Sequence, residues 1–77
     1  MVRWMIEFMD KIYTNIRDFD KVKLSDNTYA LPYYFPKGER FKITDINNEF
    51  VVLINLKLNI SIKMDLNYFK ELMHEKN

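Results

Sequence analysis

The chain has 77 residues, of which 48% are hydrophobic and 16% aromatic. At this length only one core fits, so we expect a single domain over residues 1–77 in which aromatic rings supply much of the buried area. The formal net charge is +1, from 12 Lys and Arg against 11 Asp and Glu, which excludes a global field that would attract polyanions.

Cysteine is absent, which excludes disulfides and thiolate metal sites, and we therefore expect a protein of the reducing cytoplasm. No apolar run approaches the roughly 20 residues of a membrane-spanning helix. The sequence thus predicts no membrane association.

Residues 2–19 carry apolar side chains at the spacing of an amphipathic helix, with charged residues on the opposite side. Trp4 and Phe8, four residues apart, form an apolar ledge beside this stripe. The ledge has two interpretations. It packs beneath a loop of the same domain, or it is a contact surface for a partner protein or a second copy, which would form a homodimer through residues 2–19.

The period then changes to that of strands. Residues 22–24 predict a short strand, followed by a turn. Residues 29–36 hold both prolines and three of the five tyrosines, and they predict an irregular loop or an edge strand because proline lacks a backbone donor. Gly38 is expected to form a turn with positive φ.

Three further elements alternate in the manner of strands, over residues 40–45, 49–56 and 60–64. The middle one is apolar on both faces, so we expect cover on both sides, with the N-terminal helix as one layer. Asp65 is expected to cap a C-terminal helix over residues 66–74. The predicted fold class is therefore α+β.

Residues 29–69 resemble the Src-homology-3-like small β-barrel. Ala-Leu-Pro-Tyr-Tyr at residues 30–34 stands where that family carries its Ala-Leu-Tyr-Asp-Tyr strand, and residues 36–43 look like its diverging turn. The later strands correspond to its strand with a tryptophan pair and to its last strand, short 3₁₀ turn and closing strand. The resemblance implies a five-stranded antiparallel barrel, or an incomplete version of it, over residues 22–69. The N-terminal helix lies outside the resemblance, and we expect it to pack on the sheet because the middle strand is apolar on both faces.

In the peptide-binding members of this family, aromatic rings form a groove for polyproline helices. By position, the resemblance implies that Tyr33, Tyr34 and Tyr68 are such rings. Glu49 and Phe50 stand in place of the tryptophan pair. The resemblance therefore implies a general protein-binding role and does not extend to proline-rich peptides.

The sequence offers little for catalysis. His74 is the only histidine, and neither Ser25 nor Ser61 lies in a nucleophile elbow. The single glycine excludes a phosphate-cradling loop, and the carboxylates do not cluster as cation ligands. We expect no active site, cofactor or metal ion.

Lys37, Arg40 and Lys42 closely follow Tyr33 and Tyr34 in the sequence. Basic groups beside stacking rings are what single-stranded nucleic acids bind, so nucleic-acid binding is an alternative hypothesis. The same three cations also suit a solvated strand edge that discourages pairing with other chains.

We expect a non-catalytic protein-binding module. The composition is rich in Asn, Ile and Lys and has one Gly, which is typical of A/T-rich coding DNA. On this basis we hypothesise an accessory protein of a phage or other mobile element that docks on a host protein complex and modulates or inhibits it. The alternatives are a small-barrel nucleic-acid binder and a structural homodimer held by the N-terminal helix.

Overall fold

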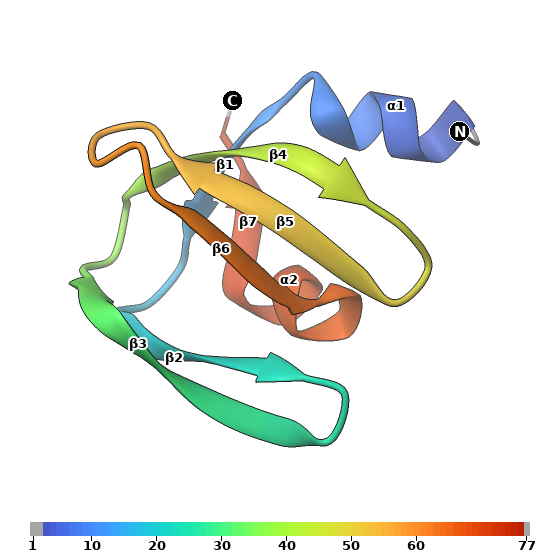
Figure 1. The fold of residues 1–77 in the computed structure, drawn as a ribbon. Coiled ribbons are helices and arrows are strands. Elements are labelled where there is room, and N and C mark those ends of the chain that lie inside the picture. Colours follow the sequence, from blue (N-terminus) through green and yellow to red (C-terminus); the bar gives the residue numbers. More distant parts are fainter. Residues whose placement is uncertain (1–2, 77) are drawn as a thin grey trace.

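A computed structural model describes residues 3–76, with side chains from residue 6 onward. The elements in chain order are α1 (Arg3–Met9), β1 (Ile12–Asn15), β2 (Phe19–Leu24), β3 (Asn27–Phe35), β4 (Arg40–Ile46), β5 (Phe50–Asn55), β6 (Ser61–Asp65), α2 (Leu66–Leu72) and β7 (Met73–Glu75) (Figure 1). All strand pairs are antiparallel. The described chain is thus a small, mostly antiparallel α+β fold with two short helices, neither of which is long and apolar enough to cross a membrane.

Five strands form one sheet in the order β6-β5-β4-β1-β7, and β2 and β3 form a separate hairpin. The alternation predicted for β4, β5 and β6 is present: Phe41 and Ile43, Val51 and Leu53, and Ile62 and Met64 point to one buried face. The hairpin and α2 lie on this inner face of the sheet (Figure 1). The core therefore fills the space between the sheet, the hairpin and α2.

The expected closed barrel is not confirmed. Within residues 3–76, β2 and β3 pair only with each other, and β2 contacts β6 without a hydrogen-bonded ladder. To close a barrel on this side, a strand of the hairpin would have to pair with β1, and β7 already occupies that position. The described residues form two packed sheets with open edges.

The helix predicted over residues 2–19 is wrong beyond Met9. β1 follows and inserts between β4 and β7. Its buried side chains are Tyr13 and Asn15, which gives a period of two, whereas Ile16 is exposed. The helical spacing of the apolar residues did not reveal this strand because one of its two inward positions is polar.

α1 lies beside the part of β4 that β1 leaves unpaired. β1 pairs with β4 only from Arg40 to Lys42, and α1 contacts β4. Phe8 and Met9 pack against the core from this position. The cover expected for β5 from the N-terminal helix is not confirmed, since α1 contacts β4 and Val52 on the outer face of β5 is half-buried.

The cap predicted at Asp65 is confirmed. Its Oδ1 accepts hydrogen bonds from Asn67 N at 2.8 Å and Tyr68 N at 3.4 Å, which satisfies two free donors of α2. The helix expected to reach residue 74 ends at Leu72. Met73 has extended backbone angles and pairs with β1. The chain after α2 therefore forms strand β7, which lies beside β1 in the sheet.

Candidate functional site

The second half of β3 departs from regular pairing. Phe35 pairs with Phe19 and Ala30 pairs with Lys21, so residues 31–34 stand opposite Asp20 alone. Pro32 within this bulge cannot donate a ladder hydrogen bond, which agrees with the predicted edge character of the segment. Within the bulge Tyr33 and Tyr34 are exposed, whereas Leu31 packs against the core.

Tyr33 and Tyr34, called the tyrosine pair below, are carried by this bulge. Their side chains are 42% and 60% exposed. The Tyr33 ring lies 6.4 Å, centroid to centroid, from the buried ring of Phe35. One tyrosine is therefore supported from behind by the core, while the other projects further into solvent.

Asp18 orients Tyr34, one member of the tyrosine pair, and sequence reasoning missed it. Its carboxylate accepts a hydrogen bond from the Tyr34 hydroxyl at Oδ2 and from Lys37 N at Oδ1, the latter at 2.7 Å. These contacts, the Tyr34 hydroxyl first, lower the pKa of Asp18, and the same bond raises the pKa of Tyr34. Tyr34 and Lys37 lie 16 and 19 positions after Asp18 in the sequence, so no local sequence pattern reveals these contacts.

Asn15 anchors the segment that follows the tyrosine pair. Its buried Nδ2 donates to the carbonyl oxygens of Pro36 at 2.8 Å and Arg17 at 3.0 Å. Its backbone oxygen accepts from Gly38 N at 3.0 Å. Gly38 has φ +91°, so the predicted positive-φ turn is confirmed, and its backbone nitrogen is held by Asn15.

Tyr68, which the resemblance grouped with the tyrosine pair, is placed elsewhere. It lies on α2, is half-buried, and donates from its hydroxyl to the backbone oxygen of Lys21 on β2 at 3.0 Å. The guanidinium of Arg17 lies 6.0 Å from its ring centroid. Among the described rings no contact joins Tyr68 to the tyrosine pair, and its hydrogen bond gives it a role in docking α2 against the hairpin.

The ledge expected from Trp4 and Phe8 is only partly described. The side chain of Trp4 lies outside the described residues. The ring of Phe8 stacks on Tyr13 at 6.2 Å and meets the edge of Phe69 at 6.2 Å, both of which are buried. Phe8 thus closes one end of the core.

The three cations predicted for nucleic acid do not gather around the tyrosine pair. Arg40 and Lys42 alternate with buried Phe41 and so point to the outer face of the sheet, away from the hairpin. Lys37 lies in the connection between β3 and β4. Its backbone nitrogen, not its ammonium group, is what contacts Asp18.

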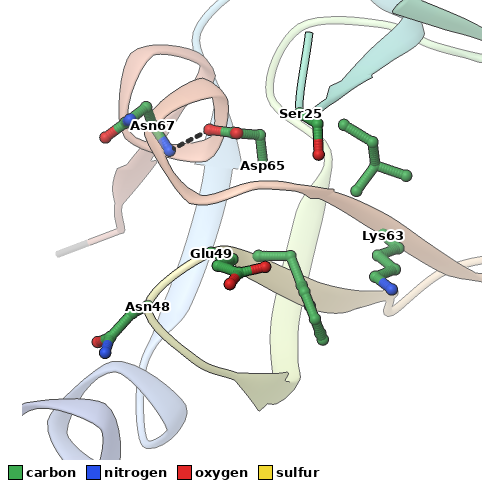
Figure 2. A pocket seen from close by; sticks show the side chains of 8 residues that line it. Ser25, Asn48, Glu49, Lys63, Asp65 and Asn67 are labelled. Carbon is green, nitrogen blue, oxygen red and sulfur yellow. Dashed lines mark hydrogen bonds between the residues drawn. The ribbon is translucent and has the colours of Figure 1, made fainter. Parts of the chain in front are cut away.

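A pocket of about 380 Å³ lies at the tip of the β2–β3 hairpin (Figure 2). Asp65 in its wall is engaged as the cap of α2, and the Lys63 ammonium lies 3.9 Å from the centroid of the Phe50 ring. Asp65 and Lys63 are thus already engaged with other groups of the domain. The lining residues are Leu24, Ser25, Asn48, Glu49, Phe50, Lys63, Asp65 and Asn67.

Comparison of the chain with protein-family models, with characterised proteins and with solved structures finds no significant match.

Proposed function

We propose that this protein is a non-catalytic protein-binding module whose contact centre is the tyrosine pair on β3. The observation that carries the proposal is the joint exposure of Tyr33 and Tyr34 on a bulged edge strand, with Tyr34 oriented by Asp18. Large exposed aromatic side chains that are fixed by their own domain are typical anchors of protein interfaces.

The composition around the pair supports a protein partner. Residues 27–36 contain no Asp, Glu, Lys or Arg, although most of them are exposed. Depletion of charge together with enrichment in tyrosine is the signature of the centre of a protein–protein interface. A phosphate-binding surface would need several cations here, whereas the charge hydrogen-bonded to Tyr34 is the carboxylate of Asp18, with Lys37 as a single neighbouring cation.

Pre-organisation strengthens the same inference. The Tyr34 hydroxyl is bonded to Asp18, and the Tyr33 ring rests on Phe35. Rings that are already ordered lose less conformational freedom when a partner binds, so more of the contact energy appears as affinity. The anchor at Asn15 extends this rigidity to the β3–β4 connection.

Recognition through side chains agrees better with β3 than addition of a partner strand. The outer edge of β3 has no strand neighbour among the described residues, yet Pro32 removes one donor and the bulge interrupts the regular ladder. We therefore propose that a partner covers the tyrosine pair instead of extending the sheet.

The test begins with capture of partners by the immobilised full chain from cytoplasmic extract. If the chain is an accessory protein of a mobile element, as its composition suggests, the extract is that of the host cell. The captured protein is then purified and its affinity measured by calorimetry. The Tyr33→Ser/Tyr34→Ser variant should lose about 2 kcal/mol or more of binding free energy.

Tyr29→Ser is the matched control. Tyr29 lies on the same strand with 49% exposure, but pairs regularly with Val22 near the other end of the hairpin. Affinity should change little in this variant. For the wild type and for Tyr29→Ser, affinity should also depend little on salt concentration, since the contact is not ionic. If the folded double variant binds the purified partner as tightly as the wild type, the tyrosine pair is not the contact centre.

A further inference from the structure

The register of the five-stranded sheet gathers basic side chains from three strands and one strand end on its outer face, the face turned away from the hairpin and α2. Alternation along β4 directs Arg40 and Lys42 there, and alternation along β6 does the same for Lys63. All three are exposed. The sequence separates these residues, and only the strand order brings them together.

The other edge of the sheet adds to the same face. Arg40 pairs with Thr14, which pairs with His74 on β7. Lys42 pairs with Ile12, whose backbone oxygen accepts from Lys76 N at 2.8 Å. His74 and Lys76, both exposed, therefore extend the basic surface across β1 and β7. Arg40, Lys42, Lys63, His74 and Lys76 are called the outer basic face below.

Among the described side chains, those of Asp45 and Asp65 form no ion pair with this surface. Asp45 and Asp65 lie toward the ends of β4 and β6 that are farther from Arg40 and Lys42, and each accepts a hydrogen bond from a nearby backbone nitrogen, at 3.0 Å and 2.8 Å. Glu75 follows the opposite alternation from His74 and forms an ion pair with Lys11 at 3.3 Å. Among the described side chains no carboxylate lies within ion-pair distance of the four Lys and Arg of the outer basic face.

The net charge of +1 therefore conceals an uneven distribution of charge. On the hairpin side, Asp18, Asp20 and Asp26 flank the cations Lys21 and Lys23, so their charges largely offset one another. The opposite side carries the outer basic face. A polyanion is therefore attracted to that face, which overall charge does not reveal.

The geometry points to sequence-independent binding of the phosphate backbone of double-stranded nucleic acid by the outer basic face. Along β4, Arg40 and Lys42 are about 7 Å apart, and Lys42 and Lys76 are about 10 Å apart across two strand spacings. Such a spread lets several cations contact phosphates of one duplex, whose two strands together carry a charge about every 1.7 Å along the axis.

The same face lacks what recognition of single strands requires. Phe50 is the one aromatic residue that the alternation of β4, β5 and β6 places there, and it is half-buried with the Lys63 ammonium 3.9 Å from its ring centroid. Single strands are held mainly by bases stacked on exposed rings. Contacts from this face reach phosphates and carry no base readout.

The test measures binding of the full chain to a labelled DNA duplex of about two helical turns by fluorescence anisotropy, between about 50 and 200 mM NaCl. The Arg40→Gln/Lys42→Gln variant should bind at least about tenfold more weakly. Its plot of log affinity against log salt should be less steep by about 2, because each lost phosphate contact removes about 0.9 from the slope.

Lys21→Gln/Lys23→Gln is the matched control, because it removes the same charge from exposed positions on β2. Normal duplex binding by this control and by Tyr33→Ser/Tyr34→Ser, with weak binding by the β4 variant, supports the inference and separates it from the protein-binding site. Melting by circular dichroism confirms that each variant is folded.

Four results would overturn the inference: no salt-dependent duplex binding by the wild type at about 50 mM NaCl, equal losses in the β4 and β2 variants, loss of duplex binding in the tyrosine variant, or preference for an oligothymidine strand over the duplex. Vesicles containing phosphatidylserine form a further arm. If they bind through Arg40 and Lys42 while the duplex does not bind, the face is a membrane contact and the inference is wrong.

Discussion

Tyr34 donates a hydrogen bond from its hydroxyl to Oδ2 of Asp18, which lies sixteen residues earlier in the chain. Oδ1 of the same carboxylate accepts from Lys37 N at 2.7 Å, so Asp18 joins the beginning of β2 to the end of β3 and the turn that follows. Both side chains are exposed, and exposed polar contacts stabilise a fold only weakly. The main effect of the contact is to orient Tyr34.

The first prediction concerns this contact. Tyr34→Phe removes the largest cause of the lowered pKa of Asp18, so that pKa should rise toward its ordinary value, while the bond from Lys37 N keeps part of the shift. Carbon-detected NMR titration of the Asp18 carboxyl measures the change. Tyr33→Phe is the control and should leave the pKa of Asp18 unaltered.

The pH dependence of stability follows from the same shift. A carboxyl whose pKa is lower in the folded state stabilises the protein above its unfolded-state pKa, and this contribution is lost as pH falls through the folded-state value. Tyr34→Phe narrows the difference between the two pKa values and should flatten the acid limb of the stability curve. An Asp18 titration that is identical in the variant and the wild type would show that the hydrogen bond is absent in solution.

The second prediction concerns Gly38, at φ +91°. A Cβ placed there would meet no atom within 4 Å, so Gly38→Ala isolates backbone strain from steric clash. We expect a loss of about 1–2 kcal/mol in the free energy of unfolding, measured by urea denaturation. Asn48→Ala, at an exposed turn residue without positive φ, should change stability by less than about 0.5 kcal/mol. Equal effects would mean that the β3–β4 turn relaxes to another conformation.

Local patterns predicted the middle of the fold well. In β4 and β5 the inward positions are apolar except Asn55 at the end of β5. They follow a period of two until the bulge between Ile43 and Asp45, and Gly38 and Asn47 mark the adjoining turns. β1 was not predictable in this way because Asn15 occupies an inward position. Its burial is tolerated because Nδ2 donates to the backbone oxygen of Arg17 close by and to that of Pro36 in a distant segment.

The candidate sites depend more strongly on tertiary structure. The sequence indicated Tyr33 and Tyr34 through the density of aromatic residues and prolines around them. Tyr68 was grouped with them by the family resemblance, but its hydroxyl donates a hydrogen bond to the backbone oxygen of Lys21 on β2 instead. Lys63 and Lys76 share a face with Lys42 only because β5 and β1 intervene in the sheet. Strand order is a long-range property, and no short window of sequence encodes it.

The third prediction addresses α1. Phe8→Ala removes a ring that contacts Tyr13 and Phe69 at the end of the core, and we expect a loss of about 2–4 kcal/mol in the free energy of unfolding. Ile6→Ala on the same helix is the control, since Ile6 is 49% exposed and its truncation should cost less than about 0.5 kcal/mol. Both values come from urea denaturation followed by circular dichroism. If the two variants are equally stable, α1 is an appendage and does not belong to the fold.

The last prediction concerns Tyr13 at alkaline pH. Burial, with a smaller contribution from the charge of Glu75, raises the pKa of Tyr13 from 10.0 to about 12. Because the folded-state pKa is the higher one, the contribution of Tyr13 to stability is complete below about pH 10 and is lost as pH rises through about 12. Between neutral pH and about pH 11 the wild type should therefore lose more stability than Tyr13→Phe, which has no phenol to ionise at this position.

Urea denaturation of both proteins at the two pH values measures this difference. The other tyrosines and the lysines titrate in both proteins, so their effects cancel in the comparison. Glu75→Gln should retain most of the alkaline loss seen in the wild type, because burial is the larger cause of the shift. If the wild type and Tyr13→Phe lose stability in parallel, Tyr13 ionises as freely in the folded state as in the unfolded one, and its phenol is not shielded at the contact with Phe8 and Phe69.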